Sequence, residues 1–279
     1  MIARLMAPEL QFLWGQPVII ENRPGANAIV ATEAAARAAP DGHTLLLAAG
    51  NHTTNPAVYA RLPYDTERDF APVAVAALAP TVLLVNPATP YRTVAELVAA
   101  AKARPGAIGY ATSGTGGVGH FAGEMLKQAA GVDLPHVAYR GTAPALQDLV
   151  SGVVPVSFAT LSTALPLIRD NRLRPVAIAT ASRLPMLPGV PSFVEAGYAG
   201  FEATSVWYGL MAPAGLSPDL VRRLADDAAA VLRKPELREK FEAQACIPGD
   251  EGPAAFSERI RRELPLWEDL ARASSIRVD

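Results

Sequence analysis

A glycine-rich loop is the feature of the sequence whose residue types carry the clearest chemistry. Residues 113–120 read Ser-Gly-Thr-Gly-Gly-Val-Gly-His, between a predicted strand at 108–111 and a predicted helix at 118–130. The N-terminus of a helix exposes unpaired N–H groups and carries partial positive charge, so it suits an anion. Glycine also lets a ligand approach the backbone closely. The loop therefore predicts a site for a small anion.

The same glycines allow two other interpretations. Gly114, Gly116 and Gly119 form the pattern G-x-G-x-x-G, which is typical of dinucleotide-binding loops. The next predicted strand ends in Tyr139-Arg140 instead of an acidic residue, and an arginine there suits the 2′-phosphate of NADP. An NAD(P)-binding oxidoreductase therefore stays open as the alternative, and so does a purely structural turn.

A second loop, Tyr139-Arg140-Gly141-Thr142-Ala143-Pro144, also joins a predicted strand to a predicted helix. Arg140 could form a charge-assisted pair with a carboxylate, or it could be an ordinary surface arginine. Gly141 and Thr142 favour the first interpretation, because they expose the N-terminus of the next helix. A third loop, residues 50–56 (GNHTTNP), is rich in small polar side chains that can orient a ligand, although a solvated turn has the same composition.

Known catalytic and metal-binding patterns are missing from the sequence. It contains no G-x-S-x-G, no H-E-x-x-H and no Gly-Lys pair, and Cys246 is its one cysteine. No two of the four histidines stand at metal-ligand spacing from each other. His52 and His120 lie in the candidate loops, where a ligand hydrogen bond is the expected role. We therefore expect no catalytic residue, no metal and no cofactor.

The elements that position these loops alternate between strand and helix, which predicts an α/β fold with parallel sheets. Strands are expected at 17–21, 44–48, 81–85, 108–111, 136–139, 155–158, 175–180 and 206–211, with helices between them and a helix-rich segment after Ser217. The apolar strands 81–85 and 206–211 bracket the middle of the chain. They predict two α/β lobes: residues 1–85 with 206–279, and residues 86–205.

The charge and hydrophobicity of the chain limit the kinds of partner that it can have. The chain has 279 residues, 19% of them charged, and a formal net charge of −2, which argues against a nucleic-acid partner. The longest apolar stretch, residues 71–85, is interrupted by Pro72 and Pro80 and is too short to span a membrane. The first residues, MIARLMAPEL, do not show the order of regions that marks a signal peptide.

An ordered set of motifs resembles the Bug family, the TctC-type receptors of tripartite tricarboxylate transporters. The motifs are QPVIIENRPGAN (16–27), APDGHTLLLA (39–48), SGTGGVGH (113–120), VAYRGTAPALQDLVSG (137–152), SRLPMLPGVPSFVEAGYAGFEA (182–203) and WYGLMAPAG (207–215). The resemblance implies a type II periplasmic-binding-protein fold, with two lobes joined by crossing strands and a cleft between them. It implies a receptor without catalytic activity that traps a small organic acid by hinge closure, a membrane permease as partner, and export to the periplasm.

The resemblance also implies the ligand contacts and two departures. By this resemblance the contacts are Asn51 and Thr53 in one lobe and, in the other, Ser113, Thr115, Gly116, Gly117, His120, Tyr139, Arg140, Gly141, Thr142 and Thr160. First, family members begin with a leader and a strand that are missing here, which should leave unpaired edges in the first sheet and weaken ligand binding. Second, many members have an acid where Ala159 stands, so we expect the ligand to be a plain carboxylic acid and not an amino acid.

Overall fold

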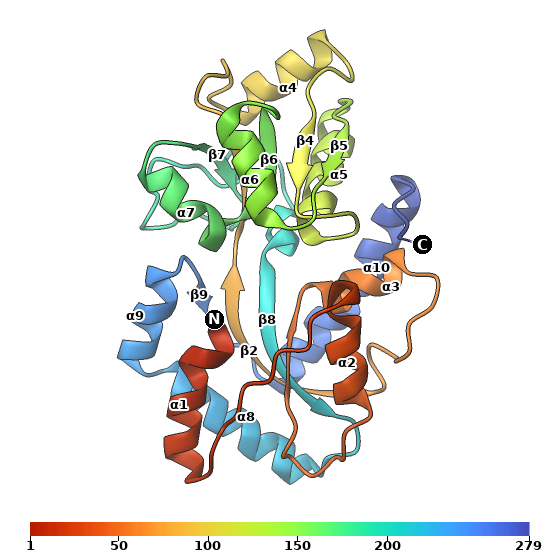
Figure 1. Cartoon of the computed structure of the whole chain (residues 1–279), viewed down its shortest axis with the longest axis vertical. Coiled ribbons are helices and arrows are strands. Elements are labelled where there is room, and N and C mark those ends of the chain that lie inside the picture. Colours follow the sequence, from red (N-terminus) through yellow and green to blue (C-terminus); the bar gives the residue numbers. More distant parts are fainter. Residues whose placement is uncertain (279) are drawn as a thin grey trace. The chain divides into compact units, whose positions relative to one another are not determined.

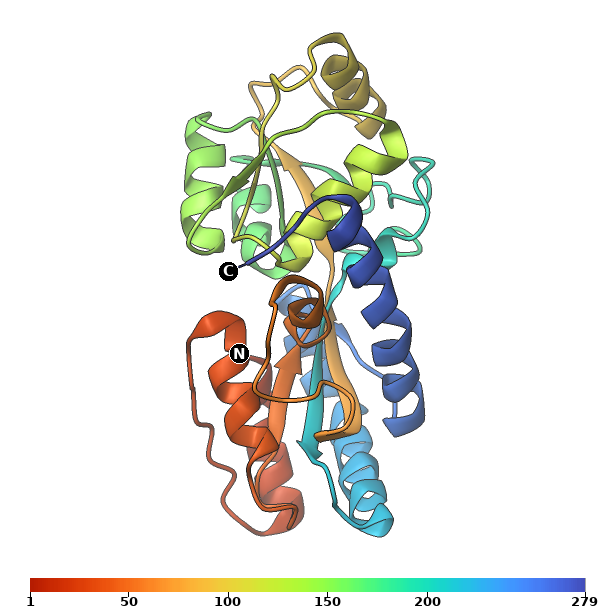
Figure 2. The same ribbon diagram turned by 90° about the vertical axis from the view of Figure 1, so that its right-hand side faces the viewer.

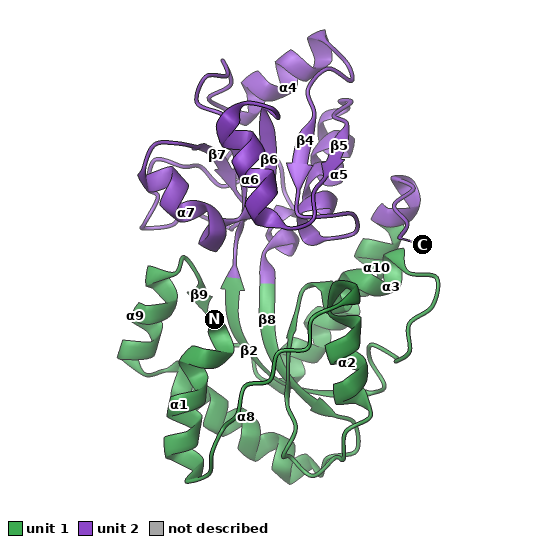
Figure 3. Cartoon of the chain, in the orientation of Figure 1, with its two compact units in different colours: residues 1–78, 207–269, 279 green, residues 79–206, 270–278 purple. Residues whose placement is uncertain are grey.

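The computed structural model describes residues 1–278, and these form two compact α/β units (Figures 1 and 3). Unit 1 comprises residues 1–78 and 207–269, and unit 2 comprises residues 79–206 and 270–278. The two-unit α/β fold expected from the sequence is therefore present. The chain leaves unit 1 earlier than residue 85, because the strand at 81–85 pairs with strands of unit 2.

Unit 1 contains a four-stranded sheet in the order β1-β8-β2-β9. Figures 1 and 2 both show β2 and β8 running side by side as the longest strands of the unit. Its elements are α1 (Ile2–Trp14), η1 (Ala26–Ala28), α2 (Ile29–Ala36), β1 (Leu46–Ala49), α3 (Asn51–Val58), β2 (Phe70–Ala79), β8 (Val206–Pro213), α8 (Pro218–Leu232), α9 (Pro235–Ala243), β9 (Ile247–Pro248) and most of α10 (Pro253–Ala273).

Unit 2 contains a five-stranded sheet in the order β5-β4-β6-β3-β7. Its elements are β3 (Thr81–Val85), α4 (Val94–Ala103), β4 (Tyr110–Thr112), α5 (Val118–Ala130), β5 (His136–Ala138), α6 (Thr142–Ser151), β6 (Val156–Thr160), α7 (Leu161–Arg169), β7 (Arg174–Ile178) and η2 (Phe201–Thr204). Helix α4 starts with a capping box between Thr93 and Glu96.

The expectation of parallel sheets is correct only for the three strands β5-β4-β6. Strand β3 is antiparallel to both of its neighbours, β6 and β7. In unit 1, β1 is antiparallel to β8, and β2 is antiparallel to β9. In unit 1 the reason is the connectivity. Strands β8 and β9 belong to the part of the chain that returns from unit 2, so no βαβ crossover links them to β1 or β2 and fixes a parallel direction.

The segment Pro17–Glu21, expected as a strand, does not form one. It is largely exposed, with Ile19 at 83%, and the Val18 amide donates a hydrogen bond to the side chain of Gln11 instead of to a neighbouring strand. Strand β1 pairs with β8 and is the edge strand of its sheet. The segment and β1 both line an apolar groove of about 210 Å³ whose other wall is α1. A strand needs a neighbour for its backbone groups, and residues 17–21 have none in the described chain.

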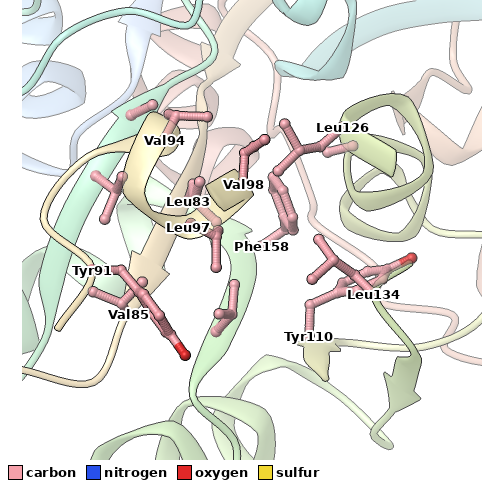
Figure 4. Close-up of a cluster of buried hydrophobic side chains, with 14 of the residues drawn as sticks. Leu83, Val85, Tyr91, Val94, Leu97, Val98, Tyr110, Leu126, Leu134 and Phe158 are labelled. Atoms are coloured by element: carbon pink, nitrogen blue, oxygen red, sulfur yellow. The ribbon is translucent and has the colours of Figure 1, made fainter. Parts of the chain in front are cut away.

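The core of unit 2 lies between its sheet and the helices α4 and α5 (Figure 4). Alternate residues of the strands point into it, among them Leu83 and Val85 of β3 and Tyr110 and Phe158 of β4 and β6. Helices α6 and α7 contribute no side chain to this cluster and contact each other and β6, so they cover the opposite face. Helices on both faces fix the ends of the strands, where the candidate loops lie.

A buried carboxylate connects three elements of unit 1. Glu263 of α10 is 3% exposed. Its Oε2 accepts a hydrogen bond from Trp207 Nε1 at 2.9 Å and lies 2.8 Å from Thr53 Oγ1 on α3. Its Oε1 lies 3.3 Å from Arg259 Nη1, and Arg259 also binds Glu251. Because the three partners come from α3, β8 and α10, this carboxylate holds the unit together across more than two hundred positions of sequence.

Replacing Glu263 with alanine should therefore destabilise the protein strongly. The change leaves the Trp207 N–H buried without an acceptor and removes the carboxylate that the Thr53 hydroxyl and Arg259 share, which should cost about 3 kcal/mol of unfolding free energy. Urea denaturation measures the difference. The matched control is Glu258→Ala on the same helix, where an exposed pair with Arg261 should contribute less than about 1 kcal/mol. Equal stabilities of the two variants would contradict the role assigned to Glu263.

Candidate anion-binding site

Three helices of unit 2 begin at one edge of its sheet. Strands β5, β4 and β6 are adjacent and parallel, so their carboxyl ends lie at the same edge, and α6, α5 and α7 start directly after them. None of the three helices has a side-chain hydrogen bond at its N-cap. The N-terminal amides of α5 and α6 are thus available for an anion, whereas the first amide of α7 donates to the carbonyl of Pro80.

The loops before α5 and α6 are joined to each other. The Gly141 amide donates to the carbonyl of Ser113 at 3.0 Å, and the Tyr139 amide donates to the carbonyl of Thr112 at 3.0 Å. Gly116 and Gly141 have φ values of 75° and 114°, in a region that residues other than glycine rarely adopt. The predicted contacts of these two loops therefore lie together at one edge, with the side chains of Ser113 and Thr115 exposed.

The charge at this edge comes from Arg140. Its side chain is exposed, whereas the neighbouring Tyr139 donates its hydroxyl proton to Asp148 Oδ2 at 2.7 Å. Desolvation and that bond raise the pKa of Tyr139 above its usual value, so the phenol stays protonated. Thr160, at the end of β6, lies 3.1 Å from the hydroxyl of Thr163 and is half-buried. One cation, two open helix N-termini and several hydroxyl groups together match the chemistry of a carboxylate.

His120 lies behind the glycine loop. Its ring is 7% exposed, and Nδ1 accepts a hydrogen bond from the Gly116 amide at 3.1 Å. The ring of His136 stacks on it, with centroids 3.7 Å apart and an angle of 13°. Burial lowers the pKa of His120 to about 4 and that of His136 to about 3, with Lys127 acting in the same direction on both and the His120 imidazole disfavouring charge on His136. Both rings are neutral at pH 7. The predicted ligand hydrogen bond from His120 would have to come from an atom other than Nδ1.

Gly119 has a packing role that the sequence pattern did not distinguish. A Cβ at this position would lie 2.9 Å from the carbonyl oxygen of Phe158 on β6. The third glycine of the pattern therefore lets α5 approach the sheet. Of the three glycines, Gly114 and Gly116 have positive φ values, 153° and 75°, whereas Gly119 does not.

The predicted contacts in unit 1 are arranged differently from those of unit 2. Residues 50–56, expected as a loop, fold largely as the helix α3, and its side chains point inward. Thr53 is completely buried at Glu263, and its hydroxyl also lies 3.0 Å from the carbonyl of Gly50. His52 is buried among aromatic rings and lies 3.0 Å from the carbonyl of Thr66, and burial lowers its pKa to about 4. In this structure both side chains serve the core of unit 1.

Asn51 donates a hydrogen bond to a strained turn at residues 26–28, which the sequence analysis did not predict. Ala26, Asn27 and Ala28 all have positive φ values, between 45° and 66°. The carbonyl of Asn27 accepts hydrogen bonds from Asn51 Nδ2 at 2.5 Å and from Asn55 Nδ2 at 3.1 Å, and Asn27 Nδ2 donates to Asn55 Oδ1 at 2.7 Å. Left-handed residues other than glycine cost energy and gather at functional sites. The Pro-Gly-Ala-Asn sequence was the available signal for this turn.

Metal binding and membrane insertion find no support in the described chain. Across residues 1–278 no group of three His, Cys, Asp or Glu side chains is placed to hold a metal ion. In the same part of the protein no helix combines the length and apolar character that a membrane span needs.

Comparison with known proteins identifies the relatives. Residues 2–249 match the family described as "Tripartite tricarboxylate transporter family receptor". BugT of Bordetella pertussis is 32% identical over 99% of this chain and 85% of its own length. The structure of R. palustris Rpa4515 with adipate superposes with a TM-score of 0.88 and 34% identity, covering 99% of this chain and 93% of that one. The structure of MatC of Rhodopseudomonas palustris with bound malate superposes with a TM-score of 0.82 and 31% identity, covering 96% of this chain and 92% of that one. These relatives confirm the resemblance and the periplasmic-binding-protein fold, and none of them supports the dinucleotide alternative.

The role of Gly119 can be separated from ligand approach by Gly119→Ala. The new methyl group meets a backbone carbonyl that cannot move easily, so the variant should lose about 1–3 kcal/mol of unfolding free energy. Gly189→Ala in the same unit is the control, because nothing lies within 4 Å of the place that its new methyl group would take. Chemical denaturation compares the two. A Gly119→Ala protein of normal stability that fails to bind ligand would assign this glycine to the ligand instead.

Proposed function

Because this chain belongs to the tripartite tricarboxylate transporter receptor family, we propose that it is a solute-binding receptor for a small organic carboxylate. We propose further that it carries no catalytic activity, works in the periplasm and delivers its ligand to the membrane permease of a tripartite transporter. Capture would involve hinge closure of the two units, a movement that a fall in the radius of gyration on ligand addition would reveal.

The observation that carries the proposal is the edge of unit 2 where α5 and α6 begin. Two uncapped helix N-termini and the exposed guanidinium of Arg140 meet there on loops that are hydrogen-bonded to each other. A carboxylate is the ligand group that uses both kinds of donor, since its two oxygens accept backbone N–H bonds and a charged pair together. Ser113, Thr115 and Thr142 add hydroxyl groups beside these donors.

The relatives support the class of ligand. Rpa4515 was found with adipate and MatC with bound malate, and both compounds are dicarboxylates.

The charge of the site argues against an amino-acid ligand. Strand β6 ends in Ala159 and Thr160, which carry no charge, and Ala159 is only 7% exposed. An ammonium group placed here would face the positive ends of two helices and Arg140. We therefore propose a plain carboxylic acid as the ligand.

Removing the charge of Arg140 tests the site directly. Arg140→Gln should weaken the binding of a dicarboxylate roughly 10- to 100-fold, the value expected for a hydrogen bond to a charged group. Titration calorimetry with adipate or malate measures the dissociation constant. Arg172→Gln, at another exposed arginine of the same unit, should leave it unchanged. Equal affinities of the wild type and Arg140→Gln would remove Arg140 from the site.

A thermal-shift screen tests the ligand class. Succinate, malate, adipate or citrate at a hundred times its dissociation constant should stabilise the wild type by about 2.7 kcal/mol, or several degrees of Tm. Glutamate and aspartate at the same concentrations should shift Tm much less. A larger shift with the amino acids would contradict the assignment of a plain acid, and a shift with NAD(P) alone would favour the oxidoreductase.

A further inference from the structure

We propose that the stacked pair His120–His136 is the positioning element of the glycine loop, in which each neutral ring holds a different glycine and neither ring contacts the ligand. The proposal deepens the proposed function, because a loop of this kind binds an anion only when its amides keep one fixed arrangement. It assigns to His120 a role different from the ligand contact that the sequence led us to expect.

His120 holds Gly116. Since Nδ1 accepts the Gly116 N–H, the proton of the neutral ring is on Nε2. Nε2 lies 3.9 Å from Glu124 Oε1, one turn further along α5, and this carboxylate favours that tautomer. Glu124 is itself fixed by Tyr110 and Lys127, each at 2.8 Å from Oε1. The acceptor that Gly116 meets is thus held in place by a chain of contacts that reaches β4.

His136 holds Gly114 through Thr112. The hydroxyl of Thr112 lies 3.0 Å from the carbonyl of Gly114, to which it donates, and it accepts the Gly114 N–H at 3.3 Å. We assign the one proton of this hydroxyl to the Gly114 carbonyl. The hydroxyl then accepts from His136 Nε2, 2.7 Å away, which puts the proton of His136 on Nε2 as well. One side chain thereby binds both the donor and the acceptor of Gly114.

The ring of His120 stacks on the ring of His136, and this contact requires that both rings stay neutral. The rings lie 3.7 Å apart, where two imidazolium groups would repel each other. The charged and titratable groups around the pair are Glu124 and Lys127 on α5 and Tyr110 on β4. Burial lowers the pKa of each histidine most, Lys127 acts in the same direction on both rings, and Glu124 offsets part of this effect at His136. Protonation of Nδ1 of His120 would turn the acceptor of Gly116 into a donor.

The arrangement also decides which amides face a ligand. Gly116 is buried, and its N–H points inward to His120. The amides that this leaves for an anion include those of Val118 and Gly119 in the first turn of α5, which have no acceptor within the helix. Gly116 serves the site through its left-handed backbone, which turns the chain into α5.

The test compares two substitutions at each histidine. His120→Asn keeps an acceptor near the position of Nδ1, whereas His120→Leu removes it at similar volume; His136→Gln keeps a donor near Nε2, whereas His136→Leu removes it. With adipate as probe, Asn and Gln variants should bind within about threefold of the wild type, and each Leu variant should bind roughly 10-fold or more weakly. Leu126→Ala, a buried site on α5 away from the loop, controls for general loss of stability. Affinities are measured well below each Tm.

Hydrogen exchange measured by amide NMR of the ligand-free proteins tests whether the glycine loop keeps its hydrogen bonds. Hydrogen exchange at Gly116 should accelerate by roughly 10-fold in His120→Leu and stay slow in His120→Asn, and Gly114 should respond in the same way to the His136 variants. Leu126→Ala should leave both amides unchanged. Leu variants with wild-type affinity and unchanged exchange at both glycines would overturn the proposal. If the wild type binds no acid, the proposed function fails, and the exchange data still decide whether the histidines hold the loop.

The pH profile separates positioning from structure. As the pH falls from 6 toward 3.5, His120 of the wild type takes up a proton near its pKa of about 4 and loses Gly116, whereas His120→Asn cannot titrate there. Adipate itself is protonated in this range, equally for both proteins. The ratio of wild-type affinity to Asn-variant affinity should therefore fall on acidification, and a constant ratio would contradict the requirement for a neutral His120.

Discussion

The parallel pairing of β4 with β5 on one side and β6 on the other decides where the chemistry of unit 2 lies. Parallel strands end together, so three helices have to begin together, and the free amides of two of them, α5 and α6, lie at one edge. The glycine loop, Arg140 and Thr160 are separated by up to 47 positions in the sequence, yet this single constraint puts them at one edge. Helices on both faces of the sheet then keep the strand ends fixed.

Unit 1 depends on an interaction of a different kind. Its carboxylate at Glu263 is buried with an arginine, an indole N–H and a threonine hydroxyl around it. A buried charge is tolerable only when it is fully paired, so each of the three elements that supply a partner is confined to one position. The helix α3 follows from this constraint, because its threonine is held at the core and its two asparagines hold the left-handed turn at residues 26–28.

Elements of unit 2 could be predicted from the sequence where local pattern and packing agree. The helix at 118–130 and the strand at 81–85 were predicted with their observed bounds. Residues 50–56 misled the prediction, because Asn, Thr and Pro are typical of turns, and the helix there is stabilised by Glu263, 210 positions away. Pro17–Glu21 has strand propensity without a neighbour to pair with. The site's loops were predictable from glycine, whereas the inward direction of His120 depends on His136 and Glu124, which no local rule connects.

The order of strands in the two sheets has a consequence for biosynthesis. All strands of unit 2 come from one continuous stretch, residues 81–178, so its sheet can close as soon as that stretch leaves the ribosome. The sheet of unit 1 combines β1 and β2 with β8 and β9, which are made last. Throughout that interval β2, a ten-residue strand of almost wholly apolar sequence, has no partner on either side. The nascent chain therefore exposes this apolar strand until β8 and β9 have been made, and β2 is a segment that a chaperone would protect during synthesis.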